Sequence, residues 1–428
     1  MVNLSDRELF EFLCVLCALL VGSYALYLVA RRLERSREGL LLVVPLFVAF
    51  GLRIAASVAV DQLSIARSLR GGDELTFLGN ASDLAALPLT SPDVTSALTS
   101  QLHIFVFSLH YRAFDLVPPA SMLRIEMITL TVLGIALLSA AVYELAGARP
   151  ARIAVWILAF EPANIFFASL LHKEPFMYLA EGLVAYGGAV LWKRGNLYAL
   201  FPMLAGCLIA IATRPYVGWF LTAAAAAVVL HASLTRQRGL RSMALTGTCL
   251  ILVFAFVPVV WNKSSDENLQ RLQGSQNANA VDESNLALEQ VDYSTRGKLI
   301  VNLPKRVGDV VFRPYPWQMQ NASQQLGVIG TTVVLACLAL LAAAIARNRR
   351  SIMPLAAPLV YPALFMLVAY ALSAGNAGTA YRYRTHVVSL ALCLVIVLLA
   401  HRRQEQEALG RTPRWLRLRP VNKTRTAS

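Results

Sequence analysis

Basic side chains flank the ends of several long apolar segments in this chain. They are Lys173, Arg214, Arg313, Arg382 and Arg384. Carboxylates accompany them in the polar stretches between those segments, namely Asp73, Glu74 and Glu174. Several cations around one cleft suit a phosphate or diphosphate group, because arginine offers a planar fork of donors and lysine a point charge. A nearby carboxylate can take the proton of an attacking hydroxyl group. The combination predicts group transfer on a lipid-linked phosphate at a membrane surface.

Each of these residues also has a simpler interpretation. A single arginine at the end of a membrane helix usually extends to the lipid headgroups. An acidic pair in a polar loop is usually solvated, and Glu174 can simply neutralise its neighbour Lys173. We favour a functional set, because charges at a membrane edge are costly unless they are paired or used. Neighbouring residues that we predict to support the site are His172, Glu174, Tyr381 and His386.

The segments between these residues are apolar enough to cross a membrane. Of the 428 residues, 57% are hydrophobic and 15% are charged, whereas a soluble domain has roughly 25% charged residues. We expect about eleven membrane-spanning helices. They lie near residues 10–30, 40–60, 122–146, 152–171, 175–192, 196–213, 216–234, 243–261, 324–346, 352–373 and 386–400. The sequence therefore predicts an all-α, polytopic integral membrane protein.

Positive charge is concentrated in every second loop. The net charge of +14 would indicate a nucleic-acid partner in a soluble protein. Here the arginines gather in residues 31–37, 236–241 and 347–350 and in the C-terminal tail. Because positively charged loops stay in the cytoplasm, we predict the N-terminus outside and the C-terminus in the cytoplasm. We expect a lipid bilayer and no nucleic acid as partner.

This topology divides the chain into six parts. They are two N-terminal transmembrane helices (1–60), a first extracytoplasmic loop with interfacial helices (61–121), a transmembrane core (122–261), a second extracytoplasmic loop (262–323), C-terminal transmembrane helices (324–400) and a basic cytoplasmic tail (401–428). In the second loop, the polar composition of residues 263–289 suits a mobile segment. Residues 299–317 contain Tyr and Trp and should be ordered near the membrane surface.

Three charges lie inside predicted spans, at Arg53, Glu161 and Glu181. Ionisable groups within a membrane are candidates for function. We favour a structural ion pair of Arg53 with one of the two glutamates. Pro162 should kink the helix that contains Glu161.

The order of these motifs resembles the GT-C glycosyltransferases, polytopic enzymes that use polyprenyl-phosphate sugars. Residues 72–81 (GDELTFLGNA) are similar to the Asp-Glu pattern of their first large loop. Residues 160–165 (FEPANI) and 172–175 (HKEP) resemble the proline-containing span and Lys-acid turn of the bacterial branch. Residues 381–384 (YRYR) resemble its closing motif. The resemblance covers roughly residues 60–400, although this chain has an extra helix before the first motif and lacks a large C-terminal periplasmic domain.

The resemblance implies a role for each matched residue. Asp73, with or without Glu74, would be the catalytic base, and the basic residues would hold the donor phosphate. It implies an enzyme of a bacterial cytoplasmic (inner) membrane whose active site faces outside. The donor would be a polyprenyl-phosphate or diphosphate sugar and the acceptor a glycan or lipid, in cell-envelope or surface polysaccharide assembly. Some relatives use a divalent metal, but no cofactor is certain because no ligand cluster here demands one.

Two alternatives remain. Residues 312–317 (FRPYPW) look like a loop of membrane proteins associated with surface polysaccharide synthesis, which favours an O-antigen-type polymerase or ligase. A transporter or flippase for a lipid or solute is the other alternative. It would have inverted repeats and broken helices that meet in the middle of the membrane.

Overall fold

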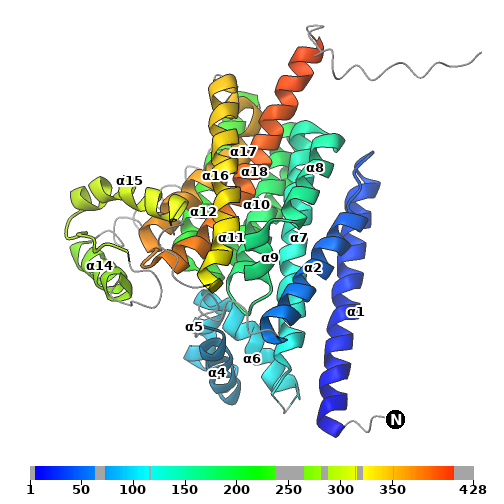
Figure 1. Ribbon diagram of the computed structural model, residues 1–428, viewed down its shortest axis with the longest axis vertical. Helices are drawn as coiled ribbons and strands as arrows, with labels where there is room; N and C mark the ends of the chain where they lie inside the picture. The colour runs from blue at the N-terminus through cyan, green and yellow to red at the C-terminus, as the bar shows by residue number, and fades with distance from the viewer. Residues whose placement is uncertain are drawn as a thin grey trace, which may run out of the picture.

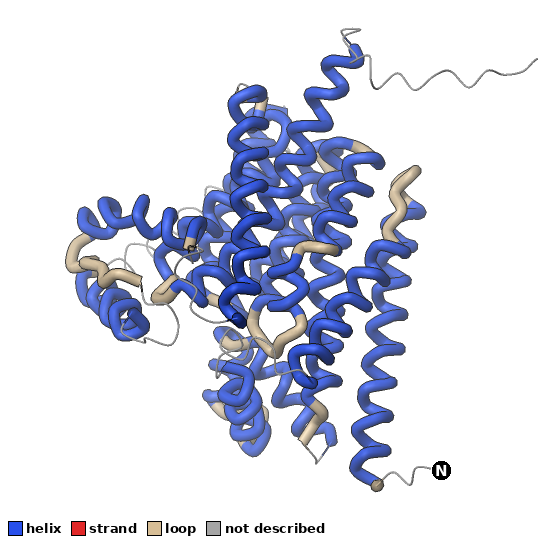
Figure 2. The backbone as a smooth tube through the Cα atoms, viewed as in Figure 1, coloured by secondary structure: helices blue, strands red, loops and turns tan. Residues whose placement is uncertain are grey.

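The chain folds as a bundle of helices. The computed structural model describes residues 5–62, 73–114, 117–236, 265–280, 288–313, 315, 322–349 and 351–408. Every regular element in these residues is a helix, as Figure 1 and Figure 2 show. Seven of the described helices are long and apolar enough to cross a membrane, and the bent pair α8–α9 makes an eighth if it counts as one span. The prediction of a multi-pass membrane protein is therefore confirmed.

Most predicted spans coincide with a helix. The helices concerned are α1 (Asp6–Arg35), α2 (Val43–Gln62), α7 (Ala120–Ala146), α8 (Ala148–Ala159) with α9 (Pro162–Ala168), α10 (Glu174–Arg194), α11 (Leu200–Thr213) after the short helix η1 (Leu197–Ala199), α12 (Pro215–Arg236), α16 (Ala322–Asn348), α17 (Ile352–Ser373) and α18 (Ala377–Ala408). The span predicted at residues 243–261 lies outside the described residues.

Helix α10 lies at the centre of the bundle and packs most closely on α7. Two glycines allow this contact. A Cβ atom on Gly134 of α7 would lie 2.5 Å from the carbonyl oxygen of Tyr178, and one on Gly182 of α10 would lie 2.8 Å from the carbonyl oxygen of Gly134. Small residues let membrane helices approach until their backbones touch. The close contact fixes the beginning of α10, where several candidate residues lie.

The two ends of the bundle differ. At one end, α4 (Asp73–Ala86), α5 (Pro92–Ser100) and α6 (Leu102–Phe114) lie near the N-terminus of α1 (Figure 1). We call this the site end. The opposite end carries the C-terminal parts of α1, α10, α16 and α18, and we call it the basic end because Arg31, Arg37, Arg194 and Arg347 lie there. Helices α4, α5 and α6 lie within residues 61–121, the part of the chain for which we expected interfacial helices.

Part of the second predicted loop is helical, including residues that we expected to be mobile. Residues 266–280 form α14 (Asp266–Ala280), and α15 (Arg296–Phe312) follows in the part predicted to be ordered. The Asn277 side chain accepts a hydrogen bond of 2.9 Å from the backbone N–H of Val291 and donates one of 3.0 Å to the carbonyl of the same residue. The Gln276 amide donates to the carbonyl of Leu372. These contacts with distant segments override a composition that is typical of disorder.

The predicted boundary of the last span was wrong. We expected residues 375–386 to form a loop, but α18 begins at Ala377, because Asn376 accepts a hydrogen bond of 2.7 Å from the backbone of Thr379. Asparagine at this position compensates a free N–H group at the start of a helix. The helix also continues to Ala408, into the predicted tail. Residues 381–384 are consequently helical.

The kink predicted at Pro162 is a break between two helices. The axes of α8 and α9 differ by 58°. Glu161 caps α9, because its carboxylate accepts the N–H groups of Ala163 and Asn164. Arg53 compensates the other side of the break. Its guanidinium donates to the carbonyls of Leu158 and Ala159, at 3.2 and 3.1 Å, and to the side chain of Asn164.

The buried Arg53 therefore has a structural role, as predicted, but through different partners. It satisfies the carbonyls that end α8 instead of forming a direct ion pair with Glu161 or Glu181. In a membrane, a backbone carbonyl without a hydrogen bond raises the free energy of the folded state by roughly several kcal/mol. An arginine that donates to such carbonyls therefore stabilises the break in the helix.

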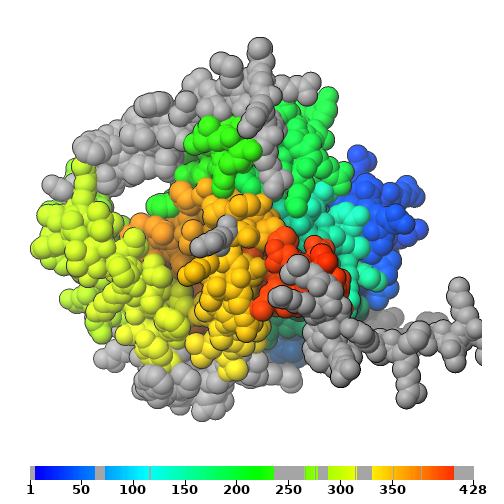
Figure 3. Space-filling view, turned by 90° about the horizontal axis from the view of Figure 1, so that it is seen from above, coloured from blue at the N-terminus to red at the C-terminus, as the bar shows by residue number. Residues whose placement is uncertain are grey.

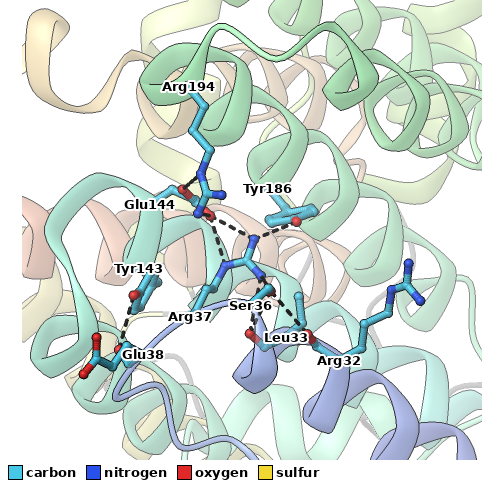
Figure 4. A network of polar contacts seen from close by, with 9 residues as sticks. All are labelled: Arg32, Leu33, Ser36, Arg37, Glu38, Tyr143, Glu144, Tyr186 and Arg194. Atoms are coloured by element: carbon cyan, nitrogen blue, oxygen red, sulfur yellow. Dashed lines mark hydrogen bonds and ion pairs between the residues drawn. The ribbon is translucent and has the colours of Figure 1, made fainter.

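A polar cluster at the basic end ties three helices together (Figure 4). Arg37, in the turn after α1, forms an ion pair of 2.8 Å with Glu144 of α7 and donates to the hydroxyl of Tyr186 of α10 at 2.7 Å. Arg194, at the end of α10, contacts the other oxygen of Glu144 at 2.8 Å. Both Arg37 and Glu144 are buried.

Glu144→Gln should destabilise the fold. The change removes the negative charge between two arginines and leaves Arg37 buried without a counter-charge, which costs about 3 kcal/mol. The measurement is the free energy of unfolding of the purified protein in a titration with denaturing detergent. Glu38→Gln is the matched control, because Glu38 lies in the same turn as Arg37 but its side chain is exposed. Equal stability of the two variants would contradict the assignment.

Candidate functional site

Four charged residues from four parts of the chain meet at the site end. Arg382 of α18 contacts Asp73, the first residue of α4, with 2.8 Å between Nη1 and Oδ2. Its Nε atom lies 3.1 Å from Oε1 of Glu174, the first residue of α10. The same oxygen accepts a hydrogen bond of 2.6 Å from Arg214, which lies between α11 and α12. The sequence analysis selected all four residues, and the structure brings them together.

Glu174 is the centre of this cluster. Its side chain has no exposed surface, and two guanidinium groups share one of its oxygens. Its position in the first turn of α10 is favourable for a negative charge, because the N-terminal end of a helix is partly positive. The sequence suggested that Glu174 could neutralise Lys173, but its partners are the two arginines.

Lys173 differs from the two arginines in its surroundings. Among the described residues no carboxylate oxygen lies within 4 Å of its amine, which instead lies 5.5 Å from the centre of the Phe77 ring. Burial, and then the positive charge of Arg214, lower the pKa of Lys173 to about 8. At neutral pH the amine is charged but easily loses its proton. An anion placed beside it would be strongly favoured.

The adjacent acids Asp73 and Glu74 have different surroundings. The side chain of Asp73 is 46% exposed, whereas that of Glu74 is only 5% exposed. Burial acts to raise the pKa of Asp73, but the charge and hydrogen bond of Arg382 outweigh it, so the pKa lies below its usual value. Asp73 is therefore ionised at neutral pH and accessible, as a general base must be.

Glu74 connects α4 to the rest of the bundle. One of its oxygens accepts the backbone N–H of Leu171 at 2.8 Å, and the other accepts a hydrogen bond of 3.1 Å from Arg124 of α7. Arg124 also pairs with Asp61 at the end of α2. We did not single out Arg124 in the sequence, although it carries the same signal, a positive charge at the start of a span on the predicted outer side.

Two neutral histidines line the same region. Burial lowers the pKa of His172 to about 4, and burial likewise lowers that of His103, on α6, well below its usual value. His172 lies 3.4 Å from Arg382 through Nδ1, and its Nε2 has no partner among the described residues. The same holds for both ring nitrogens of His103 and for Nη1 of Arg214. Buried polar atoms are usually hydrogen-bonded, so these atoms can receive a polar ligand.

Arg384 and Arg313 have other partners. Successive residues of a helix are rotated by about 100°, so Arg382 and Arg384 face nearly opposite sides of α18. Arg384 donates to the carbonyl of Arg313 and to the hydroxyl of Thr331, both at 2.8 Å, and its guanidinium lies over the ring of Tyr381. Arg313 pairs with Asp309 at 3.0 Å. These contacts join α18 to α15 and α16.

His386 lies one turn beyond Arg382 on α18, on the same face. It is fully buried, and its Nδ1 lies 3.2 Å from Glu181 in the middle of α10. The rings of Tyr178 and Tyr370 pack against it, with centroids 4.3 and 5.7 Å away. Glu181 thus has a local partner, and polar groups continue from the cluster into the bundle.

The described residues contain no group of three His, Cys, Asp or Glu side chains that could hold a metal ion. Comparison with protein-family models, curated proteins and solved structures finds no match to this chain. The site must therefore be interpreted from its own chemistry. It combines an ionised, accessible carboxylate, two arginines that are held in place by a buried acid, and an amine that has no carboxylate partner in the described part of the chain.

The low pKa of Lys173 can be measured directly. Only the uncharged amine reacts with an acylating reagent, so labelling of Lys173 should reach half its maximal rate near pH 8, as the ammonium form is lost with rising pH. The amine of a lysine in water has a pKa of about 10.4. Mass spectrometry of the labelled peptides measures the rates, with the exposed Lys298 and Lys305 as comparison. The same pH dependence for all three lysines would contradict the buried environment.

Proposed function

We propose that this protein is a membrane glycosyltransferase of the GT-C type. It moves a sugar from a polyprenyl-phosphate or diphosphate donor to a hydroxyl group at the outer face of a bacterial cytoplasmic membrane. The observation that carries the proposal is the contact of the accessible Asp73 carboxylate with Arg382, within reach of the charge of Lys173, whose amine has no carboxylate partner among the described residues. A base and an anion site thus lie side by side at one end of a membrane bundle.

The proposed reaction needs both halves of this site. The acceptor hydroxyl attacks the anomeric carbon, a bond forms between them, and the bond from that carbon to the phosphate oxygen breaks. Asp73 receives the hydroxyl proton, and the phosphate leaves with the bonding electrons. A carboxylate with a lowered pKa is a weak base, so it takes the proton late, when the hydroxyl has become acidic through bond formation.

The leaving phosphate would be stabilised by Lys173 and by Nη1 of Arg214, which has no hydrogen-bond partner among the residues that the structure describes. Preorganised charges of this kind act strongly where water is excluded. Glu174 holds Arg214 and Arg382 in position before the donor binds. His172 and His103, both neutral, can bind sugar hydroxyls without adding charge. The neutral rings and the buried acid keep the site from becoming too positive to release its product.

Asp73→Asn should abolish transfer and preserve the fold. Removing a general base typically lowers the rate by about 10² to 10⁴-fold. Cells that lack the protein, and cells with Asp73→Asn at equal expression, should lose the same sugar or polymer and accumulate its lipid-linked precursor. Mass spectrometry of surface glycans and lipid-linked intermediates measures both. The mass that is missing distinguishes a transfer of one sugar from an O-antigen-type polymerase or ligase.

Asp83→Asn is the matched control for this experiment. Asp83 lies on the same helix, α4, but is exposed. The control should retain wild-type glycans. If Asp73→Asn cells also match wild type, Asp73 is not the base and the proposal fails.

A transporter or flippase is the second candidate, favoured by the break between α8 and α9. Transporters bind their substrates at broken helices near the middle of the membrane. Here Arg53 and Glu161 occupy the two sides of a break of 58°. Both bind the backbone at the break, so fewer of their atoms remain for a substrate. Accumulation of an unaltered lipid-linked precursor on the cytoplasmic leaflet alone would favour this candidate.

A further inference from the structure

A cavity of about 570 Å³ opens between three helices at the basic end. The last turns of α1 contribute Tyr27 and Arg31, the start of α2 contributes Val44, and the first turns of α8 contribute Arg152 and Trp156. Figure 3 shows α1 and α2 at one edge of the molecule, opposite α14 and α15. The cavity is therefore at the periphery of the bundle and belongs neither to the candidate site nor to the cluster of Figure 4.

The walls of the cavity are apolar and face the lipid. Leu41 and Val44 are largely exposed, and so are Leu20, Leu28 and other apolar residues along α1. A helix with such a surface is surrounded by acyl chains when it crosses a membrane. Pockets of about 300–1,000 Å³ suit ligands of moderate size, so this one can hold the upper part of a phospholipid.

The opening of the cavity is positively charged. Arg152 is exposed and has no partner among the described residues, while Arg31 lies 5.9 Å from the Tyr27 ring and 3.4 Å from Glu34. Glu34 offsets one of the two positive charges, and its other oxygen accepts the backbone N–H groups of Leu42 and Val43 at the start of α2, so the opening keeps a net positive charge from Arg31 and Arg152 together. Two guanidinium groups at one opening suit a phosphate group.

Two aromatic side chains mark the depth of the opening. Tyr27 lies one turn before Arg31 on α1, and Trp156 lies one turn after Arg152 on α8. Tyrosine and tryptophan prefer the layer of lipid headgroups, and arginines there reach towards phosphate. Both helices thus present the same pair of residue types, an aromatic towards the acyl chains and an arginine towards the headgroups.

We propose that this cavity binds one anionic phospholipid of the leaflet at the basic end. Its phosphate lies between Arg31 and Arg152, and an acyl chain occupies the crevice between α1, α2 and α8. A second copy of this chain is a poorer occupant, because it would bring its own arginines to the same opening. The bound lipid would fill the space beside α1, which otherwise contacts the bundle mainly through α7 and α2.

Native mass spectrometry of the full-length protein tests the proposal. The protein is equilibrated with a mixture of phosphatidylglycerol and phosphatidylcholine and then delipidated in steps. Wild type should retain one phosphatidylglycerol molecule. The double variant Arg31→Gln/Arg152→Gln should retain it about tenfold less, because each arginine near the surface contributes to binding of anionic lipid. Phosphatidylcholine should be retained equally by both proteins.

Two further variants make the test specific. Arg347→Gln/Arg349→Gln removes the same charge from exposed positions at the same end, outside the cavity, and should behave as wild type. Val44→Trp keeps both arginines but fills the cavity, and should also lose the lipid. The proposal is wrong if the two double variants lose phosphatidylglycerol equally, if Val44→Trp retains it, or if the first double variant changes only the oligomeric state.

Discussion

The buried carboxylate of Glu174 is the interaction on which the site end depends. An ion without exposed surface is tolerated only if opposite charges surround it, and Arg214 and Arg382 supply them. Because the two arginines come from distant parts of the chain, the acid holds α10, α18 and the connection between α11 and α12 in one arrangement. Arg382 then extends the arrangement to α4 through Asp73. A site built in this way is organised before any ligand binds, which is what electrostatic catalysis requires.

The same principle recurs at other depths of the bundle, with different partners. Arg53 donates hydrogen bonds to the carbonyls at the end of α8, and Arg37 and Arg194 both pair with Glu144. Glu181 contacts the ring of His386. Each polar group is compensated by a group on another helix, so these contacts also fix how the helices pack. In lipid the hydrophobic effect does not drive helices together, and such pairs and close glycine contacts replace it. The charges inside the spans are therefore explained mainly by structure, and the accessible ones at the site end are those left for function.

The sequence predicted the helical membrane class and the residues of the cluster, but not their partners. Hydropathy locates spans because the bilayer imposes a minimal length on every apolar helix. It does not locate helix ends, and the mistake at Asn376 had consequences. In a loop, Arg382 and Arg384 could both turn towards one ligand, whereas in a helix they face different neighbours. Helix α14 was missed for another reason, since its polar side chains bind the backbone of residues outside the helix, namely Val291 and the distant Leu372.

Asp73 and Glu74 illustrate why a motif identifies a site without assigning its roles. The two acids are adjacent and chemically alike, and in a loop either could be the base. At the start of α4 they point in directions about 100° apart. One direction leads to Arg124 and the backbone of Leu171, and the other leads to Arg382 and the surface. The contacts of the buried Glu74 fix the position of α4, and this position places the accessible Asp73 beside Arg382. Exchanging the two residues would put the shorter aspartate at the buried position that faces Arg124 and the longer glutamate at the accessible position beside Arg382, so the order of the pair matters as much as its presence.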